Sequence, residues 1–223
     1  MNNTSLDIAR DQVKMFWGAV GTDPSLIKYP ITFRRLKQRI ERRLGLSVLE
    51  FEPLTSGRVE HFLKENDLWN SQLLNTDPEN SDLAGALFAV ANAGIIFVRK
   101  DEQPPARKLF SLAHELGHYF IEVYLRFGQG TTYALFNRDA IGSVSRTAGG
   151  SLSEESFKEF KANQFAAELL MPRNLVLSLF GKIQKRRKKG VPQEVFVEQL
   201  MKAFGVSQRA AQVRIRDLGV ECS

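Results

Sequence analysis

The stretch that decides the fold is Arg107–His118 (RKLFSLAHELGH), which holds two histidines four residues apart. On a helix, this spacing places the His114 and His118 rings about 40° and one turn apart, so both can reach one metal ion. Glu115 between them points beside that ion, where it can accept a proton from a water molecule. We therefore predict a buried helix with a metal site and with Glu115 as the catalytic base. A pair of ordinary histidines on a helix is the alternative.

A zinc site of this kind needs a third protein ligand. His61 lies far upstream, and Tyr124 stands where a third histidine would follow six residues after the second, so the three-histidine class is excluded. A carboxylate from a later helix remains, and Ser153–Met171 has helical apolar spacing before Pro172 ends it. Periodicity does not choose among its four glutamates: Glu154, Glu155, Glu159 and Glu168.

Glu159 differs from the other three because Asn163 follows it one turn later. One helix face would then carry a metal ligand, Glu159, and a residue that can hydrogen-bond to the metal ligands, Asn163. Tyr119, Tyr124 and Tyr133 are the candidates to stabilise an oxyanion, although a structural role explains each of them better than a catalytic one.

The composition is that of a globular protein: of 223 residues, 43% are hydrophobic and 25% are charged. This size fits one domain with a small appendage. Cys222 is the single cysteine, which excludes a disulfide within the chain, and the first residues carry no signal-peptide pattern. The longest apolar stretch, Leu83–Val98, is shorter than the roughly 20 residues of a membrane helix. We expect a soluble, cytoplasmic protein.

The order of the expected elements indicates an α+β fold with a small sheet. Gly94–Lys100 is expected to be a buried strand that offers an exposed sheet edge to a substrate, and Ala84–Asn92 is ambiguous between helix and strand. Apolar periodicity and turn residues predict the remaining elements: helices over Thr4–Val20, Thr32–Leu44 and Ser56–Asn66, and a strand over Leu46–Glu52.

The strand Gly94–Lys100, the motif Arg107–His118 and the run Glu159–Pro172 (EFKANQFAAELLMP) together resemble the ImmA/IrrE family of metallopeptidases. The resemblance implies a zincin-like body over residues 1–181, with N-terminal helices to residue 45 and a catalytic core over about 46–181. In that body a small sheet packs with the active-site helix and a glutamate-bearing helix.

The resemblance also assigns the site residues. It implies that His114, His118 and Glu159 bind Zn²⁺ (or Mn²⁺), that Glu115 is the general base, and that Asn163 supports the ligands. The long separation between His118 and Glu159 is attributed to an inserted loop at Gly128–Gly150.

All the excess positive charge lies at the end of the chain, where residues 173–223 hold 11 Lys and Arg against 4 Asp and Glu. Within it, residues 190–223 read as helix, Gly-containing turn and helix, with Ser207 as an N-cap. This pattern is helix-turn-helix-like. A helical hairpin that packs on the peptidase body or docks its substrate is the alternative. Four side chains are candidates to contact DNA or a partner protein: Arg209, Gln212, Arg214 and Arg216.

Three functions stay open from the sequence. The first is a zinc endopeptidase, whose substrate the resemblance implies to be a helix-turn-helix repressor or antitoxin-like regulator, cut to relieve repression under stress. The second is a DNA-binding regulator with a structural or inactive metal site. The third is a module that sequesters a repressor without cutting it.

Overall fold

The computed structural model describes residues 3–69, 81–90, 93–124, 132–137, 154–187 and 190–223. Within these ranges the chain forms eight α-helices, four strands, a short 3-10 turn and a π-helical turn. The predicted α+β class is confirmed. The elements are α1 (Asn3–Ala19), η1 (Pro24–Leu26), α2 (Phe33–Arg43), β1 (Leu46–Phe51), α3 (Ser56–Glu65), β2 (Gly85–Val90), β3 (Ala93–Arg99), α4 (Pro105–His118), η2 (Tyr119–Val123), β4 (Thr132–Asn137), α5 (Glu154–Leu170), α6 (Arg173–Arg186), α7 (Gln193–Phe204) and α8 (Gln208–Asp217).

N-terminal capping explains why α2, α3 and α8 begin close to the positions that the sequence predicts. The hydroxyls of Thr32, Thr55 and Ser207 accept hydrogen bonds from backbone N–H groups in the first turns of α2, α3 and α8. Each cap satisfies one of the donors that a helix start leaves unpaired. α7 ends at Gly205, whose φ of 66° is a left-handed conformation that glycine adopts without strain.

The four strands form one mixed sheet in the order β1-β3-β2-β4. β1 runs parallel to β3, whereas β2 is antiparallel to both β3 and β4. The expectation that Gly94–Lys100 offers a free edge is wrong, because β3 is hydrogen-bonded to β1 on one side and β2 on the other. The segment Gly128–Gly150 was expected to be a loop, but part of it, Thr132–Asn137, forms the strand β4. The rest of that segment lies outside the described residues.

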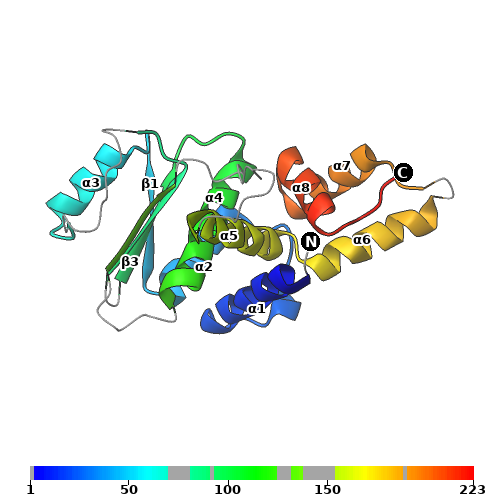
Figure 1. Cartoon of the computed structure of the whole chain (residues 1–223), viewed down its shortest axis with the longest axis horizontal. Coiled ribbons are helices and arrows are strands. Elements are labelled where there is room, and N and C mark those ends of the chain that lie inside the picture. The colour runs from blue at the N-terminus through cyan, green and yellow to red at the C-terminus, as the bar shows by residue number, and fades with distance from the viewer. Residues whose placement is uncertain (1–2, 70–80, 91–92, 125–131, 138–153, 188–189) are drawn as a thin grey trace.

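The sheet separates two hydrophobic layers because side chains alternate along each strand. Ala86 and Phe88 of β2 and Phe97 of β3 pack with the α3 side chains on one face. Leu87 of β2 and Ile96 of β3 pack on the other face with α2, α4 and α5. Figure 1 shows α3 on one side of the sheet and the helices α2, α4 and α5 on the other.

The helices α4 and α5 approach closely at Gly117. A Cβ atom on this residue would lie 3.0 Å from the Ala162 carbonyl oxygen and 3.1 Å from its Cα. Real Cβ atoms rarely approach backbone so closely, so a larger residue at this position would force the two helices apart. The glycine within the HELGH motif therefore brings the histidine-bearing helix against the glutamate-bearing helix.

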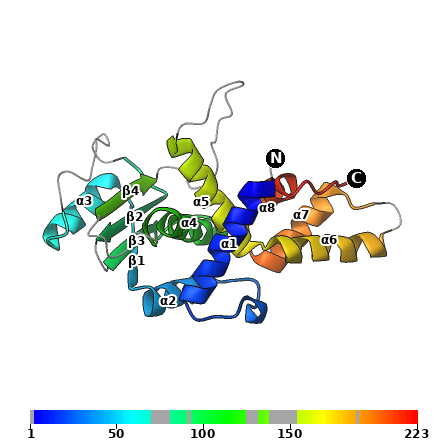
Figure 2. The same ribbon diagram turned by 60° about the horizontal axis from the view of Figure 1, so that its bottom comes forward.

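The C-terminal helices pack on the body through α5. The side-chain amide of Gln164 donates to Asp217 over 2.9 Å, and Arg214 Nε donates to the Met171 carbonyl over 3.0 Å. Arg214 also pairs with Glu168, and both side chains are buried. Figure 2 shows α6, α7 and α8 at the end of the molecule away from the sheet. The two-part division at residues 181–190 stays a prediction, as does a helix-turn-helix role for residues 190–223.

Of the part of the chain described here, no helix combines the length and apolar character needed to cross a membrane.

Candidate metal centre

Three side chains from two helices meet at one point. His114 and His118 come from α4, and Glu159 comes from α5. The two Nε2 atoms lie 3.0 Å apart, and the Glu159 carboxylate oxygens lie 3.2 Å from His114 Nε2 and 3.1 Å from His118 Nε2. Both rings are buried, whereas 29% of the Glu159 side chain is exposed. The cluster can therefore be reached from solvent on the Glu159 side.

The second nitrogen of each ring fixes its orientation. His114 Nδ1 lies 3.0 Å from the Asn163 side-chain oxygen, and His118 Nδ1 lies 2.9 Å from Glu122 Oε1. Both oxygens are acceptors, so each ring donates from Nδ1 and turns its Nε2 atom toward the other two side chains of the cluster. This is the arrangement by which protein metal sites hold imidazole ligands. Asn163 thus lies where the sequence expects it.

The electrostatics of the cluster favour a positive charge at its centre. Burial lowers the pKa of the His114 ring. Burial acts in the same direction on His118, but hydrogen bonds to Glu122 and Glu159 outweigh it and raise the pKa of that ring to about 9. Burial alone would raise the pKa of Glu159, yet the two histidines hold the pKa of this carboxyl well below its usual range. In the absence of a metal ion, the ionised Glu159 carboxylate is therefore paired with a proton held on His118.

The donor set fits zinc. The donor atoms of the three side chains all lie within 4.8 Å of one another. A tetrahedral ion with bonds of about 2.0–2.2 Å holds its ligand atoms about 3.3–3.5 Å apart, so a small outward shift of these side chains would surround one ion. Two imidazoles and one carboxylate leave a fourth position for water or substrate, as in catalytic zinc sites. The same donors also accept manganese.

The other glutamates of α5 lie elsewhere. Glu154 pairs with Lys158, and 85% of its side chain is exposed. Glu168 pairs with Arg214 and accepts hydrogen bonds from the backbone N–H of Arg173. The Glu155 side chain lies outside the described residues. Of the three whose side chains are described, Glu159 alone joins the histidines.

Glu122 is a site residue that the sequence analysis missed. It lies in the π-helical turn η2 directly after the motif, and 9% of its side chain is exposed. One carboxylate oxygen accepts from His118, and the other lies 3.3 Å from the Lys158 ammonium group. Its position four residues after His118 was the available signal, because that spacing places both side chains on one helix face.

Glu115 is buried and lies on the sheet side of α4, where its carboxylate end contacts Gly85 of β2. Tyr119 and Tyr124 are the candidate tyrosines whose side chains are described, and their role at an oxyanion stays a prediction. Tyr119 is buried against the rings of Phe120 and Tyr124, and burial raises its pKa to about 12. The Tyr133 side chain lies outside the described residues.

The C-terminal candidates divide in two. Arg209, Gln212 and Arg216 of α8 are exposed, and their contact with DNA or a partner protein stays a prediction. Arg214 is fully buried against Glu168, so the expectation that it contacts DNA or a partner is wrong. Its position on the helix did not reveal this, because the carboxylate that covers it lies 46 residues away in the chain.

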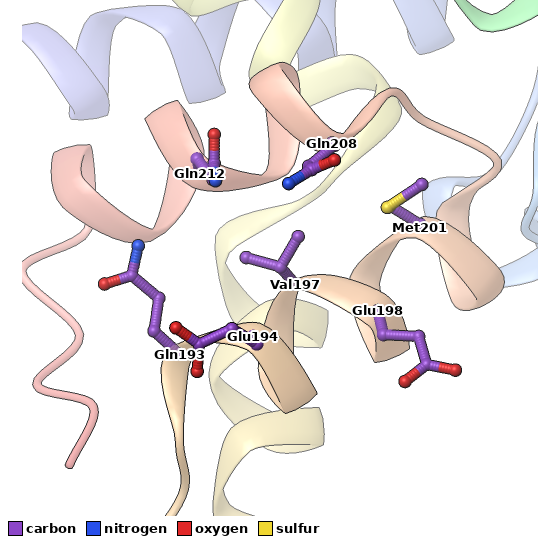
Figure 3. A pocket seen from close by; sticks show the side chains of 7 residues that line it. All are labelled: Gln193, Glu194, Val197, Glu198, Met201, Gln208 and Gln212. Atoms are coloured by element: carbon purple, nitrogen blue, oxygen red, sulfur yellow. The ribbon is translucent and has the colours of Figure 1, made fainter.

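A groove of about 230 Å³ runs between α7 and α8 beside the exposed candidates. Figure 3 shows two carboxylates on its α7 side and two amides on its α8 side, with Val197 between them. An acidic wall repels phosphate, so this groove does not favour DNA. Its lining residues are Gln193, Glu194, Val197, Glu198, Met201, Gln208 and Gln212.

A buried helix with two histidines, a glutamate between them and a carboxylate from a second helix matches the pattern of a metallopeptidase site. The family described as the IrrE N-terminal-like domain of the M78 peptidases matches residues 70–216, which include the metal cluster and most of α8. The chain belongs to this metallopeptidase family. The comparison with curated proteins gives no match.

Proposed function

We propose that the protein is a zinc-dependent endopeptidase. The observation that carries this proposal is the cluster of the buried His114 and His118 with the partly exposed Glu159, together with Glu115 on the same helix as the histidines. Membership of a metallopeptidase family supports it. A bound zinc ion supplies a Lewis acid that polarises the scissile carbonyl and makes water more acidic.

The protein's own groups perform the remaining steps. Glu115 accepts the proton of the attacking water and passes it to the leaving amine. Asn163 and Glu122 keep both imidazoles turned toward the ion throughout, because each holds an Nδ1–H in a hydrogen bond. Peptide hydrolysis then needs no covalent intermediate with the enzyme.

The substrate is proposed to bind as an extended segment along an outer strand of the sheet. β4 is one of the two outer strands among the described residues, and it pairs with β2, the strand that contacts Glu115. We further propose a helix-turn-helix repressor or antitoxin-like regulator as substrate and the cytoplasm as the site of action. Family membership and the resemblance of the motif segments support this choice.

Metal dependence and hydrolysis are tested together on purified protein. The probe is a library of peptides made from a bacterial lysate, and mass spectrometry reads the new peptide ends. Wild type should cut a defined set of peptides, lose this activity on chelation and regain it with one equivalent of zinc. Glu115→Gln should keep the metal without cutting. Glu60→Gln, which changes an exposed ion pair with Lys64, is the matched control and should cut like wild type.

Two results would contradict the proposal. Cleavage by Glu115→Gln at the wild-type rate would exclude this carboxylate as the base. Unfolding on chelation without any hydrolysis by the metal-loaded protein would favour the alternative, a DNA-binding or repressor-sequestering regulator with a structural metal site.

A further inference from the structure

The contact between Glu115 and Gly85 is unusually close. A Cβ atom built on Gly85 would lie 2.9 Å from Glu115 Cγ and 3.0 Å from its Cδ, and Oε1 would be closer still. Real Cβ atoms do not come so near other heavy atoms. The end of the Glu115 side chain therefore occupies the space that any side chain at position 85 would need.

The backbone does not explain a glycine at this position. Gly85 is not among the glycines with positive φ and sits in a paired strand, opposite Val98 of β3 and Asn137 of β4. Gly85 is the first residue of β2, and a glycine in a paired strand commonly marks a place where another group approaches closely. Here that group is the carboxylate proposed as the catalytic base.

We propose that Gly85 is a positioning residue for catalysis: by carrying no side chain, it leaves Glu115 in the orientation that the reaction needs. The catalytic part of this inference rests on the proposed function. The contact between Gly85 and Glu115 is independent of the proposed function, because it is a packing contact between two buried residues.

The way the clash would be relieved separates Gly85 from the other tight glycines. At Gly85 the three nearest atoms all belong to the end of one flexible side chain, so the Glu115 carboxylate would turn away while the backbone stays in place. At Gly94 the nearest atom is Cδ2 of the core side chain of Leu46, the Phe88 carbonyl oxygen follows at 3.3 Å, and no part of Glu115 is among them. A methyl group at position 85 should therefore displace the base, whereas one at position 94 should only strain the core.

The test compares Gly85→Ala with Gly94→Ala on the peptide that wild type cuts best in the lysate-derived library. We expect Gly85→Ala to bind one equivalent of zinc, to keep KM within about twofold and to lose about 100-fold or more in kcat, the scale of a base misplaced by about 1 Å. Gly94→Ala should unfold at a lower temperature yet keep its kcat at 25 °C. Equal kcat values for wild type and Gly85→Ala would overturn the inference.

A double-mutant cycle tests the contact without any substrate. Gly85→Ala should lower the unfolding temperature of the protein by about 3 °C or more. In a Glu115→Ala background the same change should have little effect, because the side chain that fills the space is gone. An equal loss in both backgrounds would show that Gly85 acts on something other than Glu115 and would overturn the proposal. If wild type cuts no peptide, the proposed function fails while this cycle still decides the contact.

Discussion

The carboxylate of Glu122 should control how tightly the protein binds its metal. The side chain accepts a hydrogen bond from His118 Nδ1 over 2.9 Å, and 9% of it is exposed. Glu122→Gln keeps the shape and one acceptor oxygen but removes the negative charge. A hydrogen bond to a charged group contributes about 1.5–3 kcal/mol, which corresponds to roughly 10–100-fold in a binding constant. Loss of such partners in known metal sites has an effect of the same size.

We therefore expect Glu122→Gln to bind zinc about 10–100-fold more weakly than wild type. Competition against a chromophoric chelator measures this, with the chelator chosen so that its own affinity brackets the expected range. The pKa of the metal-free His118 ring should also fall from about 9, because Glu122 is one of the three carboxylates that raise it, with Glu159 and Glu115. NMR titration of the ring protons measures that change.

The helix α3 offers a matched control. His61 and Glu65 are also four residues apart and lie 3.2 Å from each other, but 74% of the His61 side chain is exposed. Glu65→Gln should leave zinc affinity unchanged. If Glu122→Gln binds zinc as tightly as wild type does, the carboxylate does not orient His118 and the reasoning is refuted.

Three further outcomes test a helix contact beside the cluster and two ion pairs elsewhere in the fold. Gly117→Ala should push α5 away from α4, which weakens zinc binding and lowers the unfolding temperature together; calorimetry with and without zinc measures both. Arg214→Met should destabilise the protein by about 3–5 kcal/mol in urea unfolding, because it leaves the buried Glu168 carboxylate without its cation; a change below about 0.5 kcal/mol would indicate a surface role instead. Burial alone would raise the pKa of Glu50, but hydrogen bonds to Lys108 and Lys37 lower it below 4.5. The ionised Glu50 therefore stabilises the fold above pH 4.5, and this contribution is lost as the pH falls through the pKa of Glu50 in the folded protein. Glu50→Gln should make the free energy of unfolding depend less on pH between 3 and 6, as measured by denaturant unfolding.

Local signals in the sequence were sufficient to predict the helices and the approach of the two histidine rings on α4. Apolar spacing and capping residues act over a few positions, so the starts of α2, α3 and α8 fall where the caps predict. The pair His114 and His118 shares a helix, which fixes the relative positions of the two rings. Glu122 could have been found by the same argument, since it follows His118 by one helical turn.

Contacts between distant segments were not predictable in this way. Periodicity left four glutamates as candidates, and the resemblance to a family chose Glu159. β3 was expected at a sheet edge, but it lies between β1 and β2. The sequence of one strand does not show which other strands pair with it. Arg214 was predicted to contact a partner molecule, because the sequence of α8 does not show that Glu168 of α5 buries it. In each case the deciding partner comes from another part of the chain.

The comparison of protein N-termini in cells that express wild type or Glu115→Gln tests the central claim most directly. The account predicts a new N-terminus inside one regulator, present with wild type and absent with the variant, while both proteins accumulate to the same level and bind metal. The same set of N-termini in both cultures, obtained with metal-loaded wild type, would contradict the claim that this protein is a peptidase acting through Glu115.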